Sequence, residues 1–292
     1  MPPAPATPPE LRSGPFLGTR ALAAGLLTAA QLRGRAWVRV FPGVYVHRDV
    51  ELTHALRARA AALHWPDAVV TGRSAAVLWG VPLAGAAEPV ELTRLPGTHP
   101  VRTAGVRVRR QEVDGRYLDQ RGGVWVTTRE ATAVGLAGRP PLVEAVAAVD
   151  QLVTVAGADL DEIRWLAGAS SGPGCRRARR VTALADGLAG SPQETRVRLL
   201  IGRSALPGPV AQYEVRHGGR FVARVDFAWP ELRVALEYDG LWHGDPAQFA
   251  RDRQRLNRLT AAGWRVVFAT AADLRRPGEL LARIAAALSS VR

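Results

Sequence analysis

The sequence predicts an α+β/α/β multidomain protein, and three observations indicate this fold class. The chain has 292 residues, 47% of them hydrophobic, which is enough for two or three domains with buried cores. Its N-terminal part combines two short helical segments with an alternating hairpin pattern. Its C-terminal part follows the order helix, strand hairpin, helix, strand, which is typical of an α/β core.

Composition limits the classes of protein that the chain can belong to. The net charge is +13 and all 39 basic residues are arginine. This excess favours a polyanionic partner such as DNA, although a solvated basic surface gives the same count. The single cysteine, Cys175, excludes an intramolecular disulfide and a Cys-rich zinc site. The start MPPAPATPPE lacks the pattern of a signal peptide, and no apolar run reaches membrane-spanning length, so we expect a cytoplasmic protein without a membrane contact.

The first fifty positions predict a winged helix. Residues 1–15 read as a disordered Pro-rich tail. A helix over 20–25 is followed by Thr28 as N-cap of a second helix over 29–35, and WVRVFPGVYVH then alternates around a Pro-Gly turn. Helix, turn, helix and two-stranded wing, over 16–50, is the order of a winged helix, whose second helix enters the major groove. Its expected DNA contacts, unless the module binds protein instead, are Gln31, Arg33, Arg35 and Arg39.

The middle region, 51–188, reads as mixed α and β structure. ELTHALRARAAALHWPDAVVTGRSAAVLWGVPL predicts a helix, a short buried strand and a helix. Strands are expected at 89–95, 106–113 and 124–128, and helices at 129–137, 141–155, 159–166 and 176–190.

This N-terminal two-thirds resembles a known family. GVYVHRD, VVTGRSAAVLWGVPL and GVWVTTREATAVGLA are similar to segments of the AbiEi-type antitoxins of bacteria, over about 16–186. The resemblance implies a winged helix followed by an α/β domain. Gly135 stands where those relatives usually carry an aspartate.

A new domain, 189–292, is expected to begin with a capped helix. Ser191 fits the N-cap, Pro192 the first helical position and Glu194 the first turn. The helix dipole favours an acidic residue in the first turn, so this effect alone is an alternative explanation for Glu194.

Three carboxylates interrupt two strands of this domain. In VDFAWPELRVALEYDG, alternation puts Glu237 and Asp239 on one face, about 7 Å apart, and a turn after Trp229 brings Asp226 beside Glu237. Carboxylates this close repel one another unless a cation or proton neutralises them, and Mg²⁺ suits two carboxylates with waters and a phosphate. The alternative is a set of carboxylates exposed at a sheet edge.

Two further segments complete the domain. His243 follows the second strand as a general base or as a plain loop histidine. A helix over 246–262 turns apolar residues to the core and carries a basic stripe, which contacts phosphate or forms a solvated face. WRVVFAT then predicts a strand covered on both faces. The members of the stripe are Arg251, Arg255 and Arg258.

The pattern E…VDF…ALEYDG…H…D..R…L…GWRVV resembles the PD-(D/E)XK nuclease superfamily, in the branch related to very-short-patch-repair endonucleases, over about 191–288. The resemblance implies a restriction-endonuclease-like core in which Asp226 and Glu237 bind Mg²⁺ or Mn²⁺, with Glu194 as a further ligand and His243 assisting catalysis. Asp239 occupies the position of the lysine that many members carry. His243, Arg253 or a second metal would then have to supply the missing charge.

Together these patterns predict a DNA-binding, Mg²⁺-dependent endonuclease that acts on duplex DNA, intact, mismatched or nicked, in repair, restriction or defence. The alternative is a non-cleaving, antitoxin-like DNA-binding regulator with an inactive nuclease fold, which the missing lysine favours. A third hypothesis is a protein-interaction adaptor without affinity for DNA.

Overall fold

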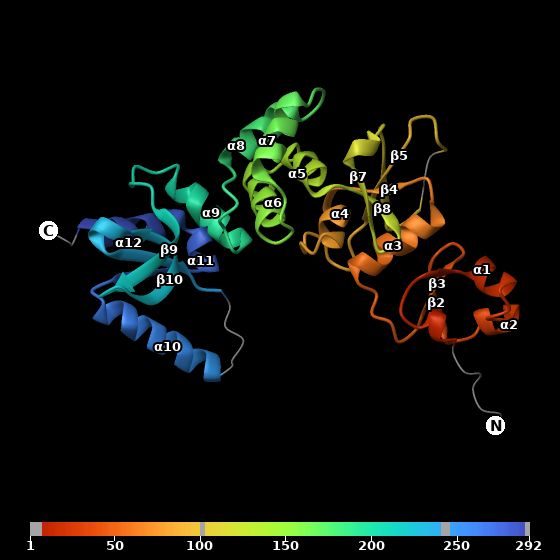
Figure 1. The fold of residues 1–292 in the computed structure, drawn as a ribbon, viewed down its shortest axis with the longest axis horizontal. Coiled ribbons are helices and arrows are strands. Elements are labelled where there is room, and N and C mark those ends of the chain that lie inside the picture. The colour runs from red at the N-terminus through yellow and green to blue at the C-terminus, as the bar shows by residue number, and fades with distance from the viewer. Residues whose placement is uncertain (1–7, 100–102, 241–245, 290–292) are drawn as a thin grey trace. The chain divides into compact units, whose positions relative to one another are not determined.

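The protein is a mixed α/β protein that divides into two compact units. The computed structural model describes residues 8–99, 103–240 and 246–289. The first unit comprises Met1–Leu136 and Val155–Ser171, and the second comprises Ala137–Thr154 and Gly172–Arg292. In the described residues the strands form sheets of three, four and five strands. The elements are coloured in chain order in Figure 1.

A small module with its own core begins the first unit. Its elements are η1 Pro9–Leu11, β1 Phe16–Leu17, α1 Gly18–Ala23, α2 Ala29–Leu32, β2 Trp37–Phe41 and β3 Val44–His47. The sheet order is β1-β3-β2. The hairpin turn contains Gly43, whose φ of 73° is a conformation that glycine adopts without steric cost. Leu11 is buried against Ala21 and Leu27, so the expectation of a disordered tail is wrong for residues around Leu11.

The second helix of this module is much shorter than the sequence suggests. Thr28 is its N-cap, as expected, and Gln31 closes a capping box: the Thr28 N–H donates to Gln31 Oε1 at 2.7 Å, and the Gln31 N–H donates to Thr28 Oγ1 at 3.2 Å. The helix ends at Leu32, because Arg33 is already its C-cap and Gly34 follows. Arg33 and Arg35 therefore do not lie on a recognition helix, and the expected helix over 29–35 is wrong.

A five-stranded sheet of order β6-β5-β4-β8-β7 forms the rest of the first unit. Its strands are β4 Val69–Val70, β5 Val90–Arg94, β6 Val106–Arg110, β7 Leu118–Arg121 and β8 Val124–Thr127, and its helices are α3 His54–His64, α4 Gly72–Leu78, η2 Gly115–Tyr117, α5 Arg129–Ala137 and α7 Leu160–Ala169. Helix α3 packs on the sheet through fully buried alanines such as Ala60 and Ala61. Strand β7 was not anticipated, because LDQR carries little strand signal, and it pairs with β8 across a Gly-Gly turn.

Three helices connect into the second unit. They are α6 Leu142–Thr154, α8 Cys175–Leu184 and α9 Pro192–Ile201. The Ser191 hydroxyl accepts the Glu194 N–H at 3.3 Å, which confirms the expected N-cap of α9. Helices α6 and α8 pack together and α6 packs on α9, and all three belong to the second compact unit.

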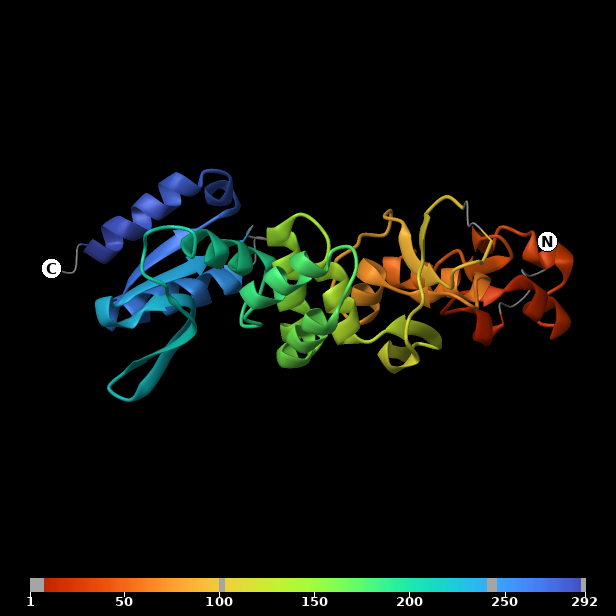
Figure 2. The same cartoon turned by 90° about the horizontal axis from the view of Figure 1, so that it is seen from above.

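A four-stranded sheet of order β12-β11-β10-β9 completes the second unit. Its elements are β9 Val210–His217, β10 Arg220–Trp229, η3 Pro230–Leu232, β11 Val234–Tyr238, α10 Pro246–Ala261, β12 Arg265–Ala269, α11 Ala271–Arg275 and α12 Pro277–Ser289. One face packs on α9 and α12 around Phe227 and Leu236, and the other packs on α10 around Val225 and Leu259. Figure 2 shows the β9–β10 hairpin extending beyond the rest of this sheet.

Strand β12 corrects one expectation and supports another. It pairs in parallel with β11, as a helix crossover requires. It is an edge strand, however, whose two faces are covered only in part: Val267 packs on one core and Val266 on the other, both half-buried, and Phe268 is 41% exposed. The apolar run WRVVFA did not distinguish an edge from a centre, because it reports hydrophobicity and not neighbours. Across the described ranges, no helix combines the length and hydrophobicity needed to cross a membrane.

Candidate metal centre

The candidate site lies where strands β10 and β11 separate. The last backbone pair of this antiparallel hairpin is Phe227 with Leu236, so continuing the register would set Asp226 opposite Glu237. Instead, the Asp226 Oδ2 atom accepts the Tyr238 N–H at 2.8 Å. The Asp226 carboxylate thus takes the place of a backbone acceptor at the point where the two strands stop pairing.

Glu194 reaches this point from α9. It is 8% exposed, and its Oε2 atom accepts the Gly190 N–H at 2.8 Å and the Gln212 Nε2–H at 2.9 Å. Gln212 has a positive φ of 48°, in the left-handed region that side-chain-bearing residues rarely adopt. The strained residue of β9 therefore supplies a neutral donor to a buried carboxylate.

The pKa values of both carboxyl groups are raised. Burial raises the pKa of Glu194, and the nearby charge of Asp226 raises it further. Burial also raises the pKa of Asp226, while the Tyr238 hydrogen bond and the charges of Arg255 and Arg224 act against the shift. A buried carboxylate with a second carboxylate near it is an arrangement that a proton or a cation relieves.

Glu237 lies on the opposite face of the sheet from α9. Leu236 belongs to the core beneath α9 and α12, whereas Ala235 belongs to the core beneath α10, and alternation turns Glu237 toward α10 as well. There Arg255 of α10 donates from Nη1 to Glu237 Oε2 and, at 2.6 Å, from Nη2 to the Arg224 carbonyl.

This arrangement corrects the expectation of carboxylates on a single face. Glu194 approaches the divergence from α9, Glu237 faces α10, and Asp226 lies between the strands. In a regular strand Val225 and Ala228, which are three residues apart, would face opposite sides of the sheet. Both pack toward α10 instead, so the β9–β10 hairpin is irregular near Gln212 and Asp226. Among the described residues, no three His, Cys, Asp or Glu side chains gather closely enough to hold a metal ion.

The residues fit Mg²⁺ as a site of two carboxylates and not as a closed cage. Mg²⁺ is commonly held by one or two carboxylates while waters and substrate phosphates complete its shell. Glu194 and Asp226 supply hard oxygen donors, and the charge of Asp226 raises the pKa of Glu194. Glu237 already has a cationic partner in Arg255, which a metal would have to share or displace.

Asp239 and His243 were also expected in the site. Asp239 is exposed just beyond β11, where its N–H donates to the Ala269 carbonyl at 2.7 Å. Asp239 thus directly follows Tyr238, whose N–H donates to Asp226, but it is exposed whereas Glu194 is buried. His243 lies outside the described residues.

Two residues of the site were missed or given another role. Gln212 carried no recognisable signal, because its place opposite the Asp226 position depends on the β9–β10 register. Arg255 was grouped with a phosphate-binding stripe by helical spacing. One signal did distinguish Arg255 from Arg251 and Arg258. It follows Asp252 by three residues and so forms the D..R pattern.

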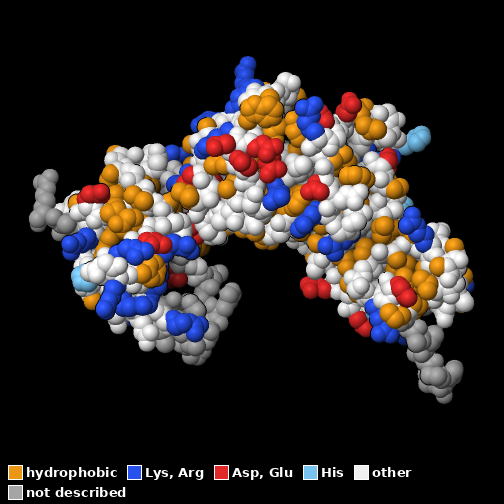
Figure 3. All heavy atoms as spheres, viewed as in Figure 1, with side chains coloured by type: hydrophobic (Ala, Val, Ile, Leu, Met, Phe, Trp, Pro, Cys, Tyr) orange, Lys and Arg blue, Asp and Glu red, His pale blue; other side chains and the backbone are white. Residues whose placement is uncertain are grey.

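The remaining predicted DNA contacts are distributed over both units. Arg33, Arg35 and Arg39 are exposed in the N-terminal module, whereas Gln31 is engaged in its capping box. In the second unit, arginines gather over α10 on the face shown in Figure 3. The exposed ones in the predicted stripe are Arg251 and Arg258.

Fold and site together define a mixed α/β protein in which buried Glu194 of a capped helix lies near half-buried Asp226 of a β-hairpin. No protein-family model matches the chain. Two proteins of Mycobacterium tuberculosis, Uncharacterized protein MT2308 (strain CDC 1551) and Uncharacterized protein Rv2248 (strain H37Rv), are each 32% identical over 265 residues, covering 90% of this chain and 96% of theirs. The chain therefore belongs to the family of these mycobacterial proteins.

Among solved structures, the crystal structure of RV2827C protein from Mycobacterium tuberculosis matches with a TM-score of 0.42 and 18% identity, covering 71% of this chain and 82% of that one.

Proposed function

We propose that the protein is a DNA-binding, Mg²⁺-dependent endonuclease of the PD-(D/E)XK type, which hydrolyses phosphodiester bonds in repair, restriction or defence. The observation that carries the proposal is the pair of buried Glu194 and half-buried Asp226 at the end of a hairpin, near enough for the charge of Asp226 to raise the pKa of Glu194. Buried carboxylates without a structural need for charge are typical of sites that bind a cation or move a proton.

In this proposal each residue has a distinct role. Asp226 and Glu194 would hold the metal ion, and waters and the substrate phosphate would complete its shell. Glu237 would have to give up its pairing with Arg255 to join them. A bound Mg²⁺ supplies a water of lowered pKa and offsets the charge that develops on the phosphate. Arg255 orients Glu237 and brings the positive charge that Asp239, in the usual place of lysine, does not provide. His243 accepts the proton of the attacking water.

The rest of the surface supports a DNA substrate. The net charge of +13 favours association with a polyanion, and the arginines of α10 lie on the helix that also carries Arg255. In the N-terminal module, Arg33, Arg35 and Arg39 would contribute phosphate contacts from a turn and a strand.

The test is cleavage of duplex, mismatched and nicked DNA by the full chain in Mg²⁺ or Mn²⁺. We expect Glu237→Gln to abolish metal-dependent cleavage and to retain DNA binding that weakens with salt. The matched control is Glu214→Gln, which changes a 53%-exposed carboxylate of the same sheet. Equal cleavage by the Glu237→Gln variant and the wild type would contradict the proposal.

A second candidate function has its own observation. Arg255 already neutralises Glu237, and Asp239 replaces the lysine, as in a site that no longer needs a metal ion. This favours a non-cleaving, antitoxin-like DNA-binding regulator. It predicts DNA binding without cleavage under any divalent metal, and no effect of Glu237→Gln on binding.

A further inference from the structure

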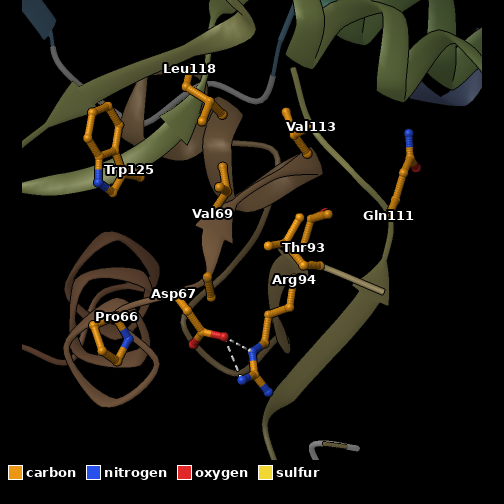
Figure 4. Close-up of a pocket in the computed structure, with 11 residues that line it drawn as sticks. Pro66, Asp67, Val69, Thr93, Arg94, Gln111, Val113, Leu118 and Trp125 are labelled. Carbon is orange, nitrogen blue, oxygen red and sulfur yellow. Dashed lines mark hydrogen bonds and ion pairs between the residues drawn. The ribbon is translucent and has the colours of Figure 1, made fainter. Parts of the chain in front are cut away.

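A cleft of about 330 Å³ lies on the five-stranded sheet of the first unit, far along the sequence from the carboxylates. This volume is at the lower end of the range for small-molecule pockets, about 300–1,000 Å³. Figure 4 shows Trp125, Leu118 and Val113 around it, with the side chains of Asp67 and Arg94 joined beneath. We call it the Trp125 cleft. Its lining residues are Pro66, Asp67, Ala68, Val69, Thr93, Arg94, Leu95, Gln111, Val113, Leu118 and Trp125.

The cleft has one flat aromatic wall. Trp125 is 45% exposed on β8, beside Val69 and Leu118 of the neighbouring strands. By contrast, Trp79 of the same unit is 9% exposed and its indole N–H donates to the Thr127 carbonyl at 2.9 Å. Unlike Trp79, the Trp125 indole is exposed and lines the cleft, which leaves part of its aromatic face accessible. Such a face favours stacking by a planar ring.

The polar floor of the cleft is electrically neutral. Arg94 donates from Nε and Nη2 to Asp67 Oδ2 at 2.9 and 2.6 Å, and from Nη1 to the His99 carbonyl at 3.2 Å. The guanidinium is therefore committed to internal partners and does not attract an anion into the cleft. Both bonds end on Oδ2 of a carboxylate that is 46% exposed, which leaves Asp67 Oδ1 to accept hydrogen bonds from a ligand.

Positive charge lies at the margin and not in the floor. Arg110 is exposed at the end of β6, directly opposite Arg94 of β5 in the sheet register. A ligand that fits this arrangement has a flat neutral ring with a hydrogen-bond donor and carries its negative charge outside the cleft. A nucleotide whose base bears an amino group has these properties.

We propose that the Trp125 cleft binds a nucleobase. The ring stacks on Trp125, the exocyclic amino group donates to Asp67 Oδ1, and the phosphate lies toward Arg110. The base comes either from a free nucleotide or from an unstacked position of a nucleic-acid strand, since the recognition chemistry is the same. This inference goes beyond the proposed nuclease and does not depend on the carboxylates of the second unit.

The test measures binding of AMP, of a short oligodeoxyadenylate and of blunt duplex DNA to the full chain by calorimetry. We expect Trp125→Leu to weaken binding of AMP, or of the single strand, about tenfold or more, because loss of one base–aromatic stack has an effect of this size. Trp165→Leu is the matched control, since Trp165 of α7 is 65% exposed and does not line the cleft. Binding of AMP identifies a nucleotide site, and binding of the single strand alone identifies an unstacked base.

A second comparison tests the Asp67 contact. IMP carries an oxo group where AMP carries its amino group, so wild-type protein should bind AMP several-fold more tightly, and Asp67→Asn should remove the preference. Unchanged thermal unfolding of each variant shows that the fold is retained. The proposal is overturned if neither AMP nor the single strand binds, or if Trp125→Leu and Trp165→Leu behave alike.

Discussion

Asp150 and Asp226, two aspartates of the second unit, have opposite surroundings. Asp150 of α6 is fully buried, and its two oxygens accept four hydrogen bonds: Oδ1 from the Asp186 and Gly187 N–H groups at 3.0 Å, and Oδ2 from Thr195 Oγ1 at 2.8 Å and Arg198 Nη2 at 2.7 Å. Asp226 of β10 accepts the Tyr238 N–H and has the carboxylate of Glu194 nearby.

The contrast teaches how to tell a structural carboxylate from a functional one. Helix α9 serves both: Thr195 and Arg198 stabilise the charge of Asp150, while Glu194 adds a second negative charge beside Asp226. A buried carboxylate whose oxygens are all paired, such as Asp150, links the helices that carry it and its partners. A carboxylate close to another carboxylate destabilises the fold at neutral pH, where both are ionised. Such pairs are typical of sites that serve binding or catalysis.

The largest expected effect is at Asp150. Asp150→Ala removes one of the two carboxylates that pair with Arg198, which keeps Asp186 at 2.9 Å. It also leaves the Thr195 hydroxyl and two backbone N–H groups without their acceptor. We expect the free energy of unfolding to fall by about 3 kcal/mol or more, as when one member of a buried ion pair is removed. Urea-induced unfolding measures this loss.

The control for Asp150 is an ion pair between the same two helices at the surface. Glu144 of α6 binds Arg196 of α9 at 2.6 Å with its side chain 48% exposed. Glu144→Ala should cost less than about 1 kcal/mol. Similar losses in the two variants would break the distinction between the buried and exposed pairs.

A smaller effect, of opposite sign, is expected at Asp226. Because its pKa and that of Glu194 are raised in the fold, their contribution to stability is fully present below their unfolded values, about 4, and is lost as pH rises through the folded values. Asp226→Asn keeps an oxygen for the Tyr238 N–H and removes the charge. The variant should therefore unfold at the same or a higher temperature than wild type at pH 7, with a smaller loss between pH 4 and 7.

Divalent metal sharpens this prediction. Mg²⁺ or Mn²⁺ should raise the unfolding temperature of the wild type at pH 7, because the ligand binds only the folded state. It should leave that of Asp226→Asn unchanged. A lower unfolding temperature for the variant without metal would make Asp226 a structural group like Asp150.

The smallest effect is expected at Gln212, the neutral donor to Glu194. Gln212→Ala removes one hydrogen bond from the ionised carboxylate and should cost about 1 kcal/mol at pH 7. The cost should shrink at pH 4, since a protonated Glu194 needs the donor less. Gln120→Ala, an exposed glutamine of β7, is the control, and denaturant unfolding at both pH values is the measurement. An equal loss of unfolding free energy at both pH values would show that Gln212 does not act through the charge of Glu194.

Elements with strong local signals could be predicted from the sequence. Ser191, Pro192 and Glu194 predicted the start of α9, because capping depends on residues within one turn. Alternation predicted the β10–β11 hairpin, which pairs antiparallel as expected. Local signals failed where pairing with a neighbouring strand decides the structure. LDQR forms β7 because it pairs with β8. WRVVFA resembles a buried strand but lies at the edge of its sheet.

The sequence by itself determined that acidic residues interrupt two strands beside a capped acidic helix, because each of these features is written in adjacent residues. Only the tertiary structure decided which of them meet. The irregularity at Gln212 and Asp226 turns Asp226 toward Glu194, while alternation leaves Glu237 on the other face with Arg255. Sheet twist and helix packing decide which side chains face one another. Both depend on contacts between segments that are far apart in the chain.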